Sequence, residues 1–318
     1  MARQIEGRFS PPDPIQNELV FVADPDLLSA KGLGPLQHSS WFSLEKRPRH
    51  EPIVHSYESY EVHIEAGSPL GIATIYDYDL LLFAVSQMVA AMKQGREVGR
   101  TIKFQGSEFY RFVGKRDAGT QNYRYLEDTI ERLNGTRIRT NLFATDEVER
   151  GRGWLNWLSD SYVIERRKKR DDVIVRLTLP DFIYRAVQNE KNWLTIDRSY
   201  FGIMSATSRF LYLWGRKAAG YREGDHWEES FELIHEKSGS RQPLRKFKET
   251  LREAIRTQSI PGYTLRETGL TKRQPKLYLE RNKTHPLLLT GSFGKIRKKA
   301  LPKFDDSANQ MRLFGDES

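Results

Sequence analysis

The stretch that decides the fold runs from Glu236 to Gln258 and reads EKSGSRQPLRKFKETLREAIRTQ. Its apolar side chains recur at the three- and four-residue spacing of a helix with one buried face: Leu244, Phe247, Leu251 and Ile255. Gly239 permits a tight turn shortly before them. We therefore predict a turn followed by an amphipathic helix over residues 243–258.

Shorter patterns on both sides of this helix complete an order of elements that occurs twice. The downstream copy has predicted helices at 205–219, 229–236 and 243–258 and strands at 263–266 and 276–281. The upstream copy has a helix that Asp77 or Asp79 can cap and that Gly95 ends, a strand at 101–104, helices at 108–112 and 120–134, strands at 137–142, 162–166 and 173–179, and a closing helix at 181–187. This is the order of a winged helix-turn-helix, so the sequence predicts an α+β protein with two such domains in tandem. Two unrelated α+β domains are the alternative.

The expected domain boundaries follow from these patterns. Residues 1–70 are rich in Pro, Gly, Ser and charge, and we interpret them as a flexible N-terminal arm with little core of its own. Residues 71–190 form the first winged helix, expected to serve dimerisation or auxiliary DNA contact. Residues 191–287 form the second, expected to be the main DNA reader, and residues 288–318 form a flexible tail.

The composition favours a polyanionic partner. Lys and Arg outnumber Asp and Glu by 51 to 42, which gives a formal net charge of +9. There is no cysteine and the 7 histidines are scattered, so we expect no metal site and no cofactor. No apolar run is long enough for a membrane helix, and Pro11, Pro12 and Pro14 interrupt any signal peptide. A soluble, cytoplasmic protein is expected.

The two longer helices that follow a short helix differ in charge. Residues 120–134 hold two arginines against three acids (2 − 3 = −1), whereas residues 241–257 hold six basic residues against two glutamates (6 − 2 = +4). Phosphates attract the second helix and repel the first. The predicted DNA contacts are therefore Ser238, Ser240, Arg241, Gln242, Arg245, Lys246, Lys248, Glu249, Arg252 and Arg256, with Arg167, Lys168, Lys169 and Arg170 at a hairpin tip that could serve as a wing.

Residue chemistry assigns roles within this set. Gln242, Arg245, Lys246 and Glu249 lie on the outward side of the N-terminal half of the helix, where base edges are usually met, and they suit adenine, guanine, guanine and cytosine. The hydroxyls of Ser238 and Ser240 suit phosphate. The alternative is a solvated charged face stabilised by pairs such as Arg245–Glu249, together with a solvated hairpin tip.

Several motifs resemble the replication initiator protein A family of bacterial plasmids. They are Gly135-Thr136-Arg137-Ile138, the stretch from Leu179 to Val187, the stretch from Thr195 to Phe201, and Glu236 to Ser240 leading into Leu244-Arg245-Lys246-Phe247. The resemblance covers roughly residues 72–285. It implies binding to repeated origin sequences (iterons), opening or marking of an AT-rich region, and recruitment of host replication proteins. Related initiators bind origins as monomers and can repress their own promoters as dimers.

The sequence lacks the signatures of an enzyme. Gly291 to Ile296 departs from a phosphate-binding loop, no His-x-His pair is present, and no carboxylate cluster suggests a two-metal nuclease. We expect initiation by binding and recruitment. A winged-helix transcriptional repressor without an origin role is the main alternative, and a DNA-processing enzyme is the second.

A short motif near the C-terminus indicates a further partner. Gln310-Met311-Arg312-Leu313-Phe314 resembles the pentapeptide by which bacterial proteins bind the polymerase sliding clamp. Gln310 supplies an amide, and Met311, Leu313 and Phe314 supply apolar area. The alternative is a tail that packs Leu313 and Phe314 back on the domain.

Overall fold

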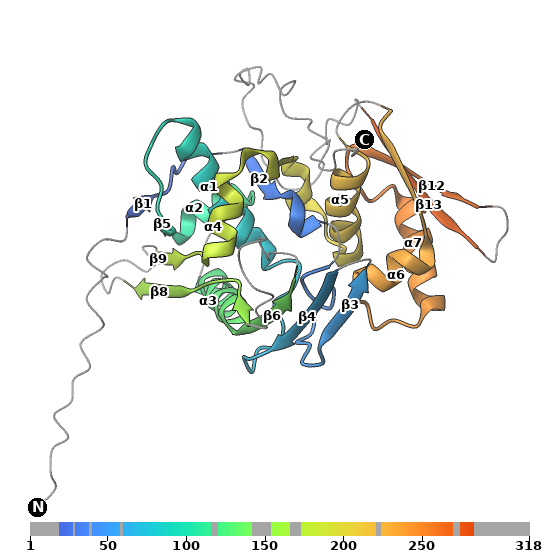
Figure 1. Ribbon diagram of the computed structural model, residues 1–318, viewed down its shortest axis with the longest axis horizontal. Coiled ribbons are helices and arrows are strands. Elements are labelled where there is room, and N and C mark those ends of the chain that lie inside the picture. Colours follow the sequence, from blue (N-terminus) through green and yellow to red (C-terminus); the bar gives the residue numbers. More distant parts are fainter. Residues whose placement is uncertain are drawn as a thin grey trace, which may run out of the picture.

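The computed structural model describes residues 19–27, 29–37, 40–57, 60–115, 120–141, 154–165, 173–220, 224–269 and 274–282 (Figure 1). The architecture is mixed α+β, with two helical units that each carry a small sheet and further strands between them. None of the helices in these residues has the length and apolar composition that a membrane-spanning segment requires.

The first unit is built around α1 (Tyr78–Lys93). It continues with β5 (Thr101–Gln105), α2 (Gly106–Phe112), α3 (Thr120–Gly135), β8 (Asp160–Glu165), β9 (Val173–Thr178) and α4 (Asp181–Gln188). The sheet order is β1-β5-β9-β8, in which β1 (Val20–Val22) runs parallel to β5 and the other pairs are antiparallel. Leu80 to Ala84 are all buried, so α1 is the central helix of this core.

The second unit repeats this order with a different sequence. It comprises α5 (Ala206–Ala218), β11 (His226–Ser230), α6 (Phe231–Ser238), α7 (Leu244–Thr257), β12 (Tyr263–Thr268) and β13 (Lys276–Arg281). Its sheet order is β11-β13-β12, so the third strand lies between the first and the second, as in β5-β9-β8. The two units therefore share a topology as well as an order of elements.

A third sheet lies between α3 and α6 (Figure 1). It consists of β3 (Ile53–Tyr57), β4 (Tyr60–Ala66), β6 (Thr136–Thr140) and β7 (Leu155–Asn156), all antiparallel in that order. A two-stranded sheet pairs β2 (Ala30–Leu33) with β10 (Trp193–Ile196). The 3-10 helices are η1 (Gly34–Gln37), η2 (Glu190–Asn192) and η3 (Arg198–Gly202).

The expected N-terminal arm is wrong for residues 20–66. All four strands in this range pair with other strands, and three of them pair with strands far along the chain, so the segment is part of the fold. Trp41, Ile53 and Ile64 are at most 1% exposed. β1 and β2 are short fragments that complete sheets with distant strands, so they carry no local periodicity. β4 does alternate apolar and polar residues, with Val62 and Ile64 buried, and this local signal was overlooked. The expected domain boundary at 190/191 places β10 and its partner strand β2 on opposite sides. The expected tail, residues 288–318, lies outside the described residues.

Candidate nucleic-acid interface

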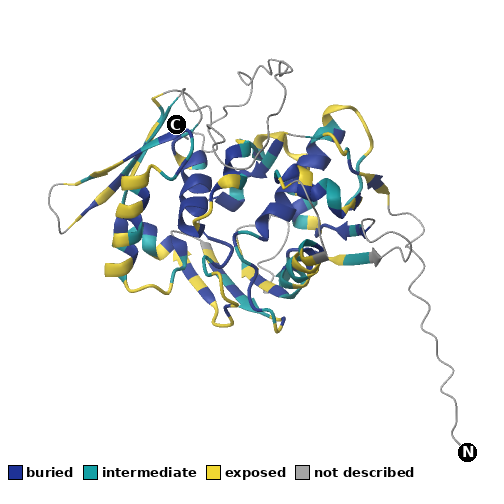
Figure 2. Cartoon of the chain, turned by 180° about the vertical axis from the view of Figure 1, so that it is seen from behind, coloured by how far each residue is buried: buried dark blue, intermediate teal, exposed yellow. Residues whose placement is uncertain are grey.

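The α6–turn–α7 region presents one helix face to solvent. The Ser230 hydroxyl accepts a hydrogen bond from the Leu233 N–H at 3.2 Å and so caps α6, which ends at Gly239 with φ of +61°. Phe247 and Leu251 are fully buried and hold α7 against the unit. The opposite face of α7 is exposed (Figure 2). This exposed face can meet a partner along its whole length.

Three of the four expected base-reading residues lie on that face, and the fourth, Gln242, lies in the turn just before the helix. Gln242, Arg245, Lys246 and Glu249 are all exposed, and the Arg245 side chain is 84% exposed. Arg245 Nη1 lies 3.6 Å from Glu249 Oε1, which is the i,i+4 pair that the alternative interpretation requires. Such an exposed pair is weak, about 0.3–0.5 kcal/mol, so it leaves both side chains able to rearrange toward a ligand.

Most other cations of α7 have acidic partners. Arg252 donates to Glu267 in β12 (Nη2–Oε1 2.9 Å), Arg256 donates to Glu253 (Nε–Oε2 2.9 Å), and Lys248 Nζ lies 2.5 Å from Glu232 Oε1. Hydrogen bonds to Glu267 raise the pKa of the Arg252 guanidinium. Lys246 has no ion-pair partner among the described residues. The net charge of α7 together with the acidic side chains around it is therefore lower than the +4 counted from the sequence of residues 241–257.

Two predicted contacts point inward. Ser238 is 1% exposed, and its hydroxyl donates to the His235 carbonyl at 2.7 Å and accepts from the Ser240 N–H. Lys248 has a side chain only 19% exposed, turned toward α6. We remove both from the set of DNA contacts, because α6 continues to Ser238 and because Lys248 lies beside Glu232. Ser240 is half-buried and its Oγ accepts from the Gln242 N–H.

Arg241 is held by acids from the N-terminal region. Its guanidinium donates to both carboxylate oxygens of Glu45, at 2.7 and 2.5 Å, and Nη1 lies 2.7 Å from Glu51 Oε2. The hydrogen bonds to Glu45 raise the pKa of Arg241. A contact across 196 residues has no local signal, so the sequence could not show these partners.

The corresponding helix of the first unit is poorly suited to phosphate. Arg132 of α3 donates to the buried carboxylate of Asp77 (Nη2–Oδ1 2.7 Å), so its charge is committed to the protein. Arg124 is exposed on the helix, together with Glu127 and Glu131. The exposed charge of α3 is thus acidic, in line with the count from sequence.

The remaining predicted residues lie outside the described residues. They are Arg167, Lys168, Lys169 and Arg170 of the hairpin tip and Gln310, Met311, Leu313 and Phe314 of the clamp motif. Within the described part of the chain, no group of three or more His, Asp or Glu side chains is placed to hold a metal ion.

Comparison with known proteins identifies the class. The family model described as "Replication initiator protein A" matches residues 36–265, so the chain belongs to the replication initiator protein A family. A curated relative, "Putative replication protein" of Wigglesworthia glossinidia brevipalpis, is 29% identical over 199 residues, covering 62% of this chain and 70% of the relative.

The fold has solved counterparts. A crystal structure of domains 2 and 3 of RctB has a TM-score of 0.53 at 13% identity and covers 75% of this chain and 93% of that one. A second structure of the same domains has a TM-score of 0.51 at 13% identity and covers 78% and 96%. At this identity the likeness concerns the fold alone.

Proposed function

We propose that this replication initiator binds double-stranded DNA sequence-specifically, at direct repeats of an origin, with α7 in the major groove. The observation that carries the proposal is the exposed N-terminal half of α7, where Arg245, Lys246 and Glu249 lie on one face, with Gln242 exposed in the turn just before the helix. Side chains of these types, at this end of a helix that follows a short helix and a turn, are those that read base edges.

Both units are, in this proposal, winged helices. The support is the shared order of helix, strand, short helix and longer helix, and the shared placing of the third strand between the first and the second. The hairpins β8–β9 and β12–β13 would then be the wings. The second unit is the main reader because the exposed charge of α3 in the first unit is acidic.

The protein acts, in this proposal, by binding and recruitment rather than by catalysis. The support is the absence from the sequence of a phosphate-binding loop and of a His-x-His pair. Incubation with supercoiled origin DNA and Mg²⁺ tests this, and we expect no nicked product. Accumulation of nicks that depends on the protein would make it a DNA-processing enzyme.

The partners proposed are origin DNA and host replication proteins in the cytoplasm, including the polymerase sliding clamp. A homodimer off DNA, joined through the first unit, is proposed from the family resemblance and the acidic surface of α3. Sedimentation of the full chain without DNA should show a dimer at tens of micromolar. A monomer at all concentrations would exclude it.

Footprinting on the DNA that flanks the gene is the direct test of function. We expect protection of several direct repeats with the same spacing. Protection of a single inverted repeat would instead indicate a transcriptional repressor, and no protection would remove the DNA-binding proposal.

A further inference from the structure

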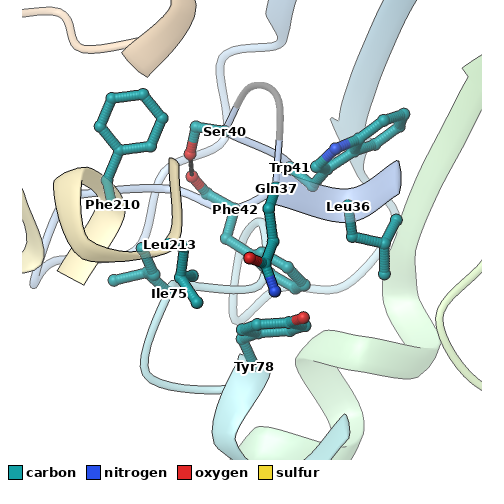
Figure 3. A pocket seen from close by; sticks show the side chains of 9 residues that line it. All are labelled: Leu36, Gln37, Ser40, Trp41, Phe42, Ile75, Tyr78, Phe210 and Leu213. Atoms are coloured by element: carbon teal, nitrogen blue, oxygen red, sulfur yellow. Dashed lines mark hydrogen bonds between the residues drawn. The ribbon is translucent and has the colours of Figure 1, made fainter. Parts of the chain in front are cut away.

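Residues 46–48, in the segment before β3, form a short exposed bend whose two ends are fixed. On the first side, Trp41 and Phe42 are 1% and 4% exposed, and the Ser40 hydroxyl donates to the Phe42 carbonyl at 2.6 Å (Figure 3). The Ser40 N–H donates to the carbonyl of Lys237 in α6 at 2.9 Å. This end is therefore anchored in the core and on α6.

The second side of the bend is fixed by Arg49. This residue is 6% exposed, and its guanidinium donates to three carbonyls: Gly239 at 2.6 Å, Glu51 at 2.9 Å and Pro52 at 2.9 Å. Burial lowers the pKa of Arg49, and the carboxylate of Glu45 opposes this change. The Gly239 carbonyl belongs to the turn between α6 and α7, so the bend is attached to the helix-turn-helix itself.

Arg241 attaches the bend a second time. Glu45 and Glu51 lie on either side of the bend, and both carboxylates lie within 2.7 Å of the Arg241 guanidinium. Arg241 is three residues before Leu244, the first residue of α7. The bend is thereby held at the N-terminal end of α7, the end that reads base edges in the proposed function.

Lys46 and Arg47 are the cations of this bend. Both are exposed, and neither has an ion-pair partner among the residues that the structure describes. Arg241, Arg252 and Arg256 are exposed as well, but each donates to a carboxylate. A cation that is already paired with a carboxylate must break that ion pair before it can bind a DNA phosphate. A solvated cation loses only bound water, and its binding releases counterions from the DNA, which raises the entropy.

We propose that Lys46 and Arg47 bind the DNA phosphates beside the site read by α7, and that Arg241 is a positioning residue for the bend and not a DNA contact. The inference rests on the proposed function, because it places the duplex on α7. Phosphate contacts of this kind set the register of a reading helix and carry no sequence information. The partner of the bend is thus the DNA backbone, whatever the base sequence.

Salt dependence is the test of the first half. For the double variant Lys46→Ala/Arg47→Ala, the plot of log affinity against log salt should become shallower. The magnitude of its slope should decrease by about 1.8, which is two phosphate contacts at about 0.9 each. The loss should be equal on a random duplex and on a duplex carrying the footprinted repeat. Arg96→Ala/Lys103→Ala, an exposed basic pair in the first unit, is the matched control and should leave the slope unchanged.

The outcomes separate this inference from the function on which it rests. An unchanged slope in Lys46→Ala/Arg47→Ala, while Lys246→Ala weakens binding to the repeat, would overturn the inference and leave the proposed function standing. If neither Lys46→Ala/Arg47→Ala nor Lys246→Ala weakened DNA binding, both the inference and the proposed function would be overturned. A loss confined to the repeat would make the two residues base readers and would also overturn the backbone assignment.

A double-mutant cycle tests the role of Arg241. If Arg241 positions the bend, removing Lys46 and Arg47 should cost much less in an Arg241→Ala background than in the wild type. Additive losses would mean that Arg241 contacts DNA by itself, which would overturn the positioning role. Thermal unfolding of all four proteins provides the structural reference, and Arg241→Lys, which keeps the charge but not the bidentate geometry, should resemble Arg241→Ala in the cycle.

Discussion

Arg209 in α5 donates a hydrogen bond from Nη1 to Oδ1 of Asp79 in α1 at 2.7 Å, and their side chains are 6% and 12% exposed. The same guanidinium donates to the carbonyls of Ile203 and Phe201 and lies 4.8 Å from the ring centroids of Tyr76 and Tyr200. The first and second units are thus joined through one buried, fully engaged cation.

Loss of this cation should destabilise the protein strongly. Arg209→Met leaves the Asp79 carboxylate buried without its partner, which typically costs about 3–5 kcal/mol. Adding Asp79→Leu should restore part of the loss. Chemical denaturation followed by circular dichroism measures both. Arg185→Ala, which removes an exposed pair with Asp181 at 2.7 Å, is the control and should cost about 1 kcal/mol or less. If Arg209→Met lowered the free energy of unfolding by no more than the control Arg185→Ala does, the prediction would be contradicted.

Sequence discrimination should depend on the N-terminal half of α7. Arg245→Ala and Lys246→Ala should each cost ~1–3 kcal/mol on the cognate repeat and little on random duplex, because bidentate base contacts are lost only there. Arg252→Ala should weaken binding to all sequences alike and reduce the salt slope by about one at most, since Arg252 is already paired with Glu267. Fluorescence anisotropy with the two duplexes measures all three.

Helix α3 supplies the control for that experiment. Glu127 is exposed on its acidic surface, so Glu127→Ala should leave DNA affinity nearly unchanged.

Equal losses on cognate and random DNA for Arg245→Ala, Lys246→Ala and Arg252→Ala would remove the assignment of base readers.

His55 should make stability depend on pH. It is 6% exposed in β3, and burial lowers its pKa to about 4, with Lys237 and Arg49 acting in the same direction. The unfolded chain, with a pKa near 6.5, binds this proton first, so the contribution is present above about pH 6.5 and is lost as the pH falls toward 4. Between pH 7 and 4.5, wild type should lose roughly 2 kcal/mol more than His55→Gln. If wild type and His55→Gln lost the same free energy of unfolding between the two pH values, this prediction would be contradicted.

The C-terminal pentapeptide should bind the sliding clamp. Burying Leu313 and Phe314 contributes ~1.5–3 kcal/mol each, less the cost of ordering the peptide. A peptide of residues 305–318 should therefore bind in the micromolar range, about −8 kcal/mol. In the full chain, Leu313→Ala/Phe314→Ala should abolish clamp binding and leave DNA affinity unchanged. Undiminished clamp binding, or unfolding of the second unit, would show that the motif serves another purpose.

The sequence predicted what local periodicity specifies and missed what distant residues supply. The helix expected at 243–258 is α7, because Phe247 and Leu251 lie at helical spacing and are both fully buried. β1 and β2 were missed because each is short and is stabilised by a distant partner strand. The β3–β4 hairpin is local, and its alternating pattern was overlooked within a segment rich in Pro, Gly, Ser and charge. The charge of the site was overestimated for the same reason. Glu45, Glu232 and Glu267 neutralise its cations from three other segments. Glu45 lies 196 residues from Arg241, and Glu232 and Glu267 belong to neighbouring elements, 16 and 15 residues from Lys248 and Arg252, whose packing against α7 a charge count along one helix does not show.

The parallel pairing of β1 with β5 affects how the protein should age in storage. β1 covers the edge of β5, with Phe21 only 7% exposed opposite Ile102. If a protease cuts between Val22 and Asp24, the backbone amides and carbonyls of β5 lose their partners and become a template for strands of other molecules. Slow precipitation after clipping, rather than an early loss of DNA affinity, is the expected sign of damage at this end of the chain.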